Sequence, residues 1–105
     1  MSDQKIEQMA IDLKCDAPRV SMDLIMRRII NVEYQTVEMC EHKFMFCAIK
    51  MDNGFVVIGE PATCVDPANW RDEIGREISY KNSFSKIWAL EGYRLASDLM
   101  PTQEI

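Results

Sequence analysis

The spacing of apolar residues changes along the chain from a helical repeat to an alternating one and back. Residues 3–14 carry apolar side chains at three- and four-residue steps, which predicts a short amphipathic helix. Residues 21–33 repeat that pattern, and Ser21 followed by Asp23 is typical of a helix start, because a serine oxygen caps free backbone N–H groups. We expect two N-terminal helices. The segment that contains the first helix, residues 1–16, could be mobile.

After the second helix, apolar and polar positions alternate, which is the repeat of a β-strand. The alternation predicts three strands over residues 34–40, 43–51 and 55–60. Between the last two lies Asn53-Gly54, the signature of a type I′ hairpin turn in which both central residues have positive φ. The three strands are therefore expected to form an antiparallel meander.

Both faces of this predicted sheet are apolar. A two-residue turn at 53–54 would pair Met51 with Val56 and Ile49 with Ile58. The other face would then carry further apolar side chains, namely Phe44, Phe46, Ala48, Phe55 and Val57. Because an apolar sheet face is normally covered, we expect helices on both faces or a second subunit on one of them.

Residues 67–100 predict one long C-terminal helix. Asp66 can cap it, and Pro67 suits the first helical position. Beside an apolar stripe runs a row of small or short residues that would let another backbone approach closely: Gly75, Ser79, Asn82, Ser85, Ala89, Gly92 and Ala96. The alternative is a break near residues 79–83 that gives two shorter helices.

These elements add up to one α+β domain over residues 1–105, with residues 101–105 as a tail. A chain of this length can bury a core without disulfide or metal support. Its net charge of −5 argues against general duplex-DNA binding, which needs a basic surface. We see no membrane-spanning run and no signal peptide before the four cysteines, so we expect a cytoplasmic protein with reduced thiols.

Few residues could carry catalytic or metal chemistry. The single histidine, His42, lies near Cys40 and Cys47 in the sequence, and the three could supply ligands to zinc or a nucleophile with its base. Their spacing matches no zinc motif and no motif supplies an oxyanion hole. We therefore expect structural cysteines, no metal and no cofactor.

Several residues are candidates for binding. Glu91 lies between Trp88 and Tyr93 on the predicted C-terminal helix, where its carboxylate could bind a ligand or accept a hydrogen bond from a tyrosine across an interface; we favour the second. Arg19 and Arg28 could bind phosphate.

The aromatic residues add to the possibility that the arginines bind a phosphate. Trp70, Trp88 or Tyr93 could stack on a base while the arginines hold a phosphate, which would make a nucleotide site.

Five short motifs, in this order, carry a family resemblance: Ala17-Pro18-Arg19-Val20-Ser21, Asn53-Gly54-Phe55, Cys64-Val65-Asp66-Pro67-Ala68-Asn69-Trp70, Glu73-Ile74-Gly75 and Lys86-Ile87-Trp88-Ala89-Leu90-Glu91-Gly92-Tyr93. The chain resembles the gene product 49 / gene product 66 family of small proteins from tailed bacteriophages, over about residues 17 to 100. The resemblance implies a phage origin and action in the cytoplasm of an infected bacterium. It brings no catalytic residues with it.

The sequence favours a non-enzymatic phage accessory protein that acts by binding, for example by inhibiting a host defence protein or a protein of nucleic-acid metabolism. In this interpretation the C-terminal helix forms a homodimer, and Tyr93, Trp88 and Glu91 contribute to its interface. The alternative is an oligomeric sponge for a nucleotide immune signal. A third hypothesis, a small hydrolase or metal protein, would use Cys40, His42 and Cys47.

Overall fold

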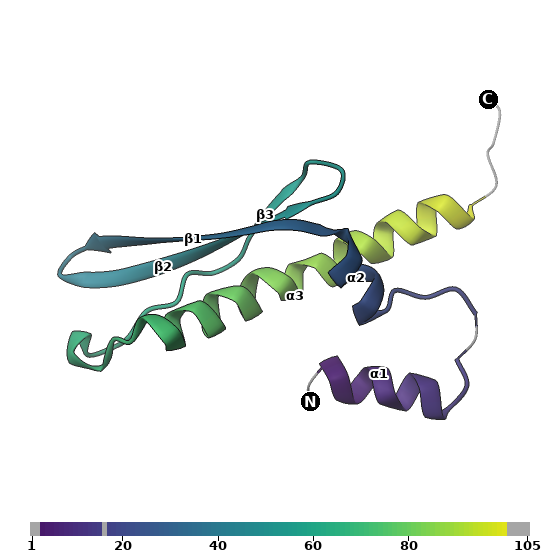
Figure 1. Ribbon diagram of the computed structural model, residues 1–105, viewed down its shortest axis with the longest axis horizontal. Coiled ribbons are helices and arrows are strands. Elements are labelled where there is room, and N and C mark those ends of the chain that lie inside the picture. The colour runs from purple at the N-terminus through teal and green to yellow at the C-terminus, as the bar shows by residue number, and fades with distance from the viewer. Residues whose placement is uncertain (1–2, 16, 101–105) are drawn as a thin grey trace.

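The computed structural model describes residues 3–15 and 17–100, so the predicted tail at residues 101–105 lies outside the described residues. The chain forms, in order, α1 (Asp3–Asp12), α2 (Met22–Arg28), β1 (Ile29–Met39), β2 (His42–Met51), β3 (Val56–Ile58), the 3-10 helix η1 (Pro67–Asn69) and α3 (Asp72–Leu99) (Figure 1). The strands form one antiparallel sheet in the order β1-β2-β3. This confirms the predicted α+β class, the three-stranded meander and the long C-terminal helix.

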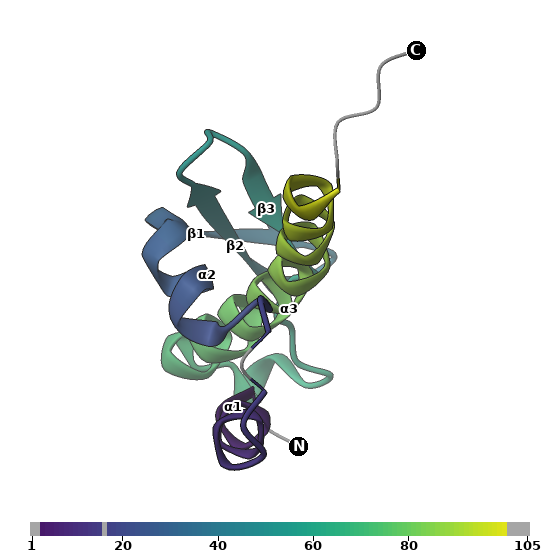
Figure 2. The same ribbon diagram turned by 90° about the vertical axis from the view of Figure 1, so that its right-hand side faces the viewer.

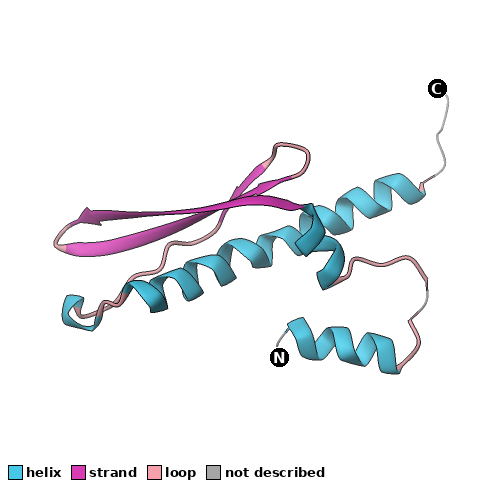
Figure 3. Cartoon of the chain, viewed as in Figure 1, coloured by secondary structure: helices cyan, strands magenta, loops and turns pink. Residues whose placement is uncertain are grey.

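The sheet and α3 lie against each other as two layers. Figure 1 shows α3 running along one side of the sheet, and the end-on view in Figure 2 shows α1 on the far side of α3 from the sheet. The long connection from β3 to η1 returns along the sheet (Figure 3) and pairs Ala62 with Met45 of β2. Within the described residues, helices therefore cover only one face of the sheet.

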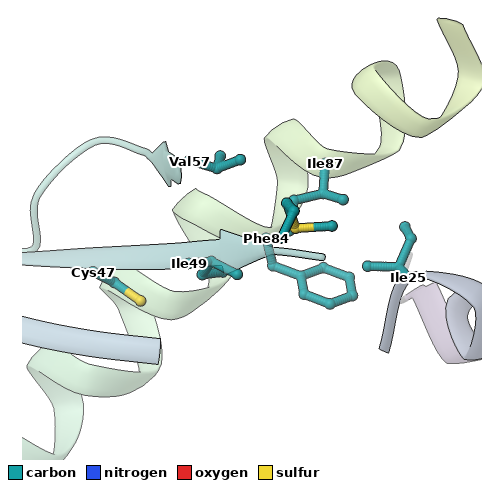
Figure 4. Packing of buried hydrophobic residues seen from close by; sticks show 7 residues of the cluster. Ile25, Cys47, Ile49, Val57, Phe84 and Ile87 are labelled. Atoms are coloured by element: carbon teal, nitrogen blue, oxygen red, sulfur yellow. The ribbon is translucent and has the colours of Figure 1, made fainter. Parts of the chain in front are cut away.

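The core lies where α2, β2, β3 and α3 meet. Its buried side chains are Ile25, Cys47, Ile49, Met51, Val57, Phe84 and Ile87 (Figure 4). Ile25, Ile49 and Ile87 are 0% exposed, so each of three elements contributes one fully buried isoleucine. Because residues of α2 and α3 meet over β2, the first and last thirds of the chain share one core.

The chain just after β3 lies directly against the backbone of α3 at Gly59. The Gly59 N–H donates to Ser83 Oγ at 2.9 Å, and the Ser83 hydroxyl donates to the Cys47 carbonyl at 2.6 Å. A Cβ added at Gly59 would collide with the Asn82 carbonyl oxygen of α3. A glycine is therefore required here so that the two backbones can approach, and a buried serine links both strands to the helix.

The row of small residues on α3 has different neighbours along its length. Gly75 and Ser79 are buried, and a Cβ on Gly75 would lie 3.1 Å from the Trp70 ring. Asn82 donates to the backbone of the β3–η1 connection at 3.1 Å. Nothing lies within 4 Å of a Cβ on Gly92. The expected close approach therefore occurs within the chain along the first half of α3, whereas the row of small residues is open at Gly92.

Two predicted helix boundaries were wrong. Ser21 caps α2 as expected, because its Oγ accepts from the Leu24 N–H at 3.1 Å, but α2 ends at Arg28 and residues 29–33 belong to β1. Ile29 and Val32 fit a helical repeat, yet both pair with residues of β2, and this long-range pairing decides the conformation.

The C-terminal helix begins at Asp72 rather than at residue 67. Asp66 caps the short 3-10 helix instead, since its carboxylate accepts from the Ala68 N–H at 2.9 Å. Trp70 follows in an extended conformation, which separates η1 from α3. From Asp72 the helix is continuous through residues 79–83, so the proposed break there is wrong.

The type I′ turn predicted at Asn53-Gly54 is found instead on the other hairpin, between β1 and β2. Cys40 and Glu41, which join β1 to β2, have φ of 53° and 63°, the signs of a type I′ turn. The Asp52-Asn53-Gly54 connection is one residue longer than predicted, because the Met51 N–H bonds to the Phe55 carbonyl, and only Gly54 has positive φ.

The longer connection shifts the strand pairing by one position and shortens the third strand. Ile49 pairs with Val57 and not with Ile58, and β3 spans Val56–Ile58 rather than residues 55–60. A shift of one residue turns a strand over, so Val57 faces the core while Val56 and Ile58 face away.

None of the helices in residues 3–15 and 17–100 has both the length and the hydropathy that a membrane crossing requires.

Alanine at two glycines should have opposite effects on stability. Gly59→Ala should lower the free energy of unfolding by about 2–3 kcal/mol, because the added Cβ meets helix backbone that cannot move aside. Gly92→Ala should raise it by about 1 kcal/mol, because the position is helical and open. Urea unfolding followed by circular dichroism measures both. Equal effects of the two substitutions would contradict the close approach at Gly59.

Candidate functional site

The predicted binding residues are not brought into one site. Arg28, Glu91 and Tyr93 lie around the second half of α3, beside a hollow of about 460 Å³ between the β2–β3 turn and the helix. Phe55 of the turn and Leu90 of the helix also line this hollow. We call it the turn–helix groove, and it is the candidate functional site.

Four charged side chains form a cluster beside the groove, and two of them, Glu91 and Arg94, line it. Arg28 Nε lies 2.9 Å from Glu91 Oε2, and Arg94 Nη1 lies 3.7 Å from Glu91 Oε1. Asp52 completes the cluster, with Oδ1 3.2 Å from Arg94 Nη1 and Oδ2 3.7 Å from Arg28 Nη1. Two arginines and two carboxylates sum to zero charge, so the cluster joins α2, the turn and α3 without attracting an anion by net charge.

The contact between Arg28 and Glu91 is an ion pair without a hydrogen bond. Glu91 is only 5% exposed. The Arg28 Nε lies close to the Glu91 carboxylate, but its N–H does not point at a carboxylate oxygen, so this buried nitrogen makes no hydrogen bond. The partners of this carboxylate within the chain are arginines. Arg94 and Asp52 were not singled out from the sequence, although the three-residue step from Glu91 to Arg94 on a helix was a usable signal.

The rim of the groove is aromatic and apolar. Phe55 is 55% exposed, Leu90 43% and Tyr93 78%. Aromatic side chains and arginine are enriched where protein interfaces carry most of their binding energy. The groove thus offers apolar anchors beside Arg94, the combination suited to binding a protein segment.

The second group of predicted residues holds α1 in place. Arg19 Nη1 donates to Glu7 Oε1 at 2.8 Å, and Trp88 Nε1–H donates to Asp3 Oδ2 at 3.0 Å. Both acceptors belong to α1. Arg19 and Trp88 are therefore engaged inside the chain in the described structure.

Trp70, the last of the predicted binding residues, lies before the start of α3. The Trp70 ring packs over Gly75, and its Nε1–H donates to Asp72 Oδ1 at 2.7 Å. Trp70 lines a hollow of about 240 Å³ together with His42 and Cys64. This hollow is separate from the turn–helix groove, so Trp70 does not share a site with Arg28 or Tyr93.

His42 links the β1–β2 turn to the segment before η1. Its Nδ1 lies 3.0 Å from the Cys40 carbonyl oxygen and its Nε2 lies 3.2 Å from the Val65 carbonyl oxygen. A neutral imidazole has one donor nitrogen, so only the protonated ring can donate to both carbonyls. These two bonds, first to Cys40 and then to Val65, raise the pKa of His42, and the carboxylates of Glu41 and Asp66 add to the effect.

The residues of the third hypothesis point apart. Cys47 is 0% exposed and faces the core, whereas His42, five positions earlier on β2, lies on the opposite face. Burial raises the pKa of the Cys47 thiol, which disfavours the reactive thiolate. In the part of the chain that the structure describes, no three His, Cys, Asp or Glu side chains are grouped to hold a metal.

Removing one charge from the buried pair should cost more than removing both. Glu91→Leu should lower the free energy of unfolding by about 2 kcal/mol, because Arg28 would lose its closest counter-charge in a mostly buried position. The double variant Arg28→Met/Glu91→Leu should recover most of this loss, because no uncompensated charge remains at the pair. Thermal unfolding of the variants measures the difference. A double variant less stable than Glu91→Leu would contradict this account.

His42 should titrate above its ordinary pKa of 6.5. A group whose pKa is raised by folding contributes stability that is complete below the unfolded pKa and is lost as the pH rises through the folded pKa. NMR of the single histidine against pH gives the pKa, and denaturation at several pH values gives the stability. His42→Gln should lack this part of the pH dependence. A measured pKa at or below 6.5 would show that the two carbonyl contacts do not persist in solution.

Comparison with known proteins identifies the family of this chain. No curated protein and no solved structure matches it. The model of the phage protein (N4 Gp49/phage Sf6 gene 66) family matches residues 20–99. This range runs from the segment before α2 to the end of α3, and so includes the whole sheet and the turn–helix groove. The match agrees with the family resemblance of the sequence motifs, and the chain belongs to the phage protein (N4 Gp49/phage Sf6 gene 66) family.

Proposed function

We propose that this phage protein is a non-enzymatic accessory protein that acts by binding another protein, and that the turn–helix groove is its binding surface. The observation that carries the proposal is the group of exposed apolar side chains, Phe55, Leu90 and Tyr93, gathered around one hollow. Apolar groups collected in a concave place serve as anchors for a partner more often than scattered ones do.

The groove is built on fixed elements. The Phe55 N–H donates to Asn53 Oδ1 at 3.0 Å, and the Gly54 N–H donates to the Met51 carbonyl at 2.9 Å, so the turn that carries Phe55 is held by its own bonds. The charge cluster joins Asp52 of the same turn to α3. Anchors that are already ordered lose little conformational entropy on binding, which favours affinity.

Family membership supports a target in the infected bacterium. We propose that the partner is a host defence protein or a protein of nucleic-acid metabolism, and that binding inhibits it in the host cytoplasm. The target segment should present an apolar or aromatic side chain to Phe55 and Tyr93. A carboxylate beside it could reach Arg94, which lines the groove.

The geometry gives the nucleotide sponge less support. Arg19 and Arg28 each already contact a carboxylate, and Trp70 lies in a different hollow. A phosphate would have to displace Glu7 or Glu91 from its arginine. The protein-binding function therefore needs fewer rearrangements of the described structure.

Affinity capture from infected cells tests the proposed function. Tagged protein should retain a bacterial protein, and Tyr93→Ser combined with Phe55→Ser should lose it, because the rim then lacks its aromatic anchors. Ile74→Ser is the matched control, since Ile74 is 53% exposed on the same helix but does not line the groove. Equal capture by the groove variant and the control would place binding elsewhere, and a bound nucleotide in native mass spectrometry would favour the sponge.

A further inference from the structure

The face of the sheet opposite α3 is uncovered and largely apolar. Alternate residues of β2 divide between the two faces: Met45, Cys47 and Ile49 are buried under α3, so their neighbours point to the other side. Strand pairing assigns further residues to that side. Its apolar members, here called the open sheet face, are Val37, Met39, Phe44, Phe46, Ala48, Val56 and Ile58.

The open sheet face is exposed in the single chain. Met39 is 52% exposed, Val56 47% and Ile58 49%. Met39 belongs to β1, and Val56 and Ile58 belong to β3. The half-buried Phe44, Phe46 and Ala48 of β2 lie between them, so the apolar surface continues across the sheet. A sheet with one solvated face normally alternates apolar and polar side chains, whereas the open side of β2 carries Phe44, Phe46 and Ala48 in succession. Such a face is typical of an interaction surface.

The surface area of the chain fits this interpretation. The accessible surface is 7924 Å², whereas a compact protein of 12.2 kDa exposes about 6,100 Å², an excess of about 1,800 Å². The radius of gyration is 17.2 Å against about 13 Å for a compact chain of this length. A stable dimer of standard size buries about 800 Å² on each partner, which is less than this excess of the whole chain.

We propose that the open sheet face is covered by the same face of a second copy of this chain. The resulting two-fold homodimer would have four layers: α3, sheet, sheet and α3. Two such sheets pack with their strands about 30° apart. This proposal goes beyond the function proposed above, because it uses none of the residues that line the turn–helix groove and leaves that groove free.

Two features of the open face favour a second copy over a different partner. A hollow of about 450 Å³ lies on it, lined by Phe46, Ala48 and Ile58 together with Glu33, Tyr34 and Gln35. A two-fold interface uses the same patch on both subunits, so this hollow and Phe46 at its edge would meet the same face of the second chain. Glu33 and Lys50 also share this face, so each chain offers both members of a charge pair.

The helix offers less to a dimer than its sequence suggested. Trp88 and Glu91 already bind Asp3 and Arg28 within the chain. Of the three residues placed at a helical interface, only Tyr93 remains largely exposed. The sheet therefore presents the more continuous apolar surface.

Sedimentation of the full chain over a range of concentrations tests the dimer. The wild-type protein should reach twice its mass of 12.2 kDa at micromolar concentration. Ile58→Lys should weaken self-association about thirtyfold or more, because it buries a charge in the interface. Leu90→Lys, at an exposed position of the groove, is the matched control and should not weaken it. Circular dichroism verifies that each variant is folded.

Small-angle X-ray scattering of the wild-type dimer provides a second readout that needs no substitution. Sheets stacked face to face with nearly aligned strands should keep a longest dimension close to the 54 Å of one chain. A concentration of 100 μM is about a hundred times a low-micromolar Kd, at which nearly all of the protein should be dimeric. A wild-type protein that stays monomeric at this concentration would overturn the proposal. So would a dimer of nearly doubled length, or one that Leu90→Lys disrupts and Ile58→Lys does not.

Discussion

A single helix can cover only one face of a sheet, and this constraint determines the rest of the structure. The sheet and α3 approach closely because Gly59 has no side chain and Ser83 bonds to two backbone groups at the contact. All buried side chains of the core gather on that side. The opposite face keeps its phenylalanines and branched residues without a covering element in the described chain. The close contact on one side thus leaves the other side uncovered in the part of the chain that the structure describes.

The sequence predicted the class of the fold because class depends on local repeats. The change from helical to alternating spacing located the sheet, and the capping by Ser21 was visible directly. The errors came where two patterns fitted one segment. Ile29 and Val32 satisfy both a helix and a strand, and only their pairing with β2 decides between them. Cys40 and Glu41 carry no turn signal, yet they form the tight turn, since strand pairing on either side fixes its position.

The candidate site was less predictable because it depends on contacts between distant segments. Arg28 and Glu91 were both singled out from the sequence, but that they contact each other follows from how α2 and α3 meet over the core. Arg19 and Trp88 share chemistry with known nucleotide sites, and the structure uses them to hold α1. Residue type therefore identified the groups that form specific contacts, and it could not distinguish contacts within the chain from contacts with a ligand.

The central claim is that the open sheet face does not meet water in the working protein. The most direct measurement places 4-fluorophenylalanine at Phe46, and separately at Phe55, and compares the ¹⁹F chemical shift of each in H₂O and D₂O. Both residues retain some exposure in the single chain, Phe55 more than half. In the purified protein at micromolar concentration, the account predicts a small solvent shift at Phe46 and a large one at Phe55. A large shift at both positions would contradict it.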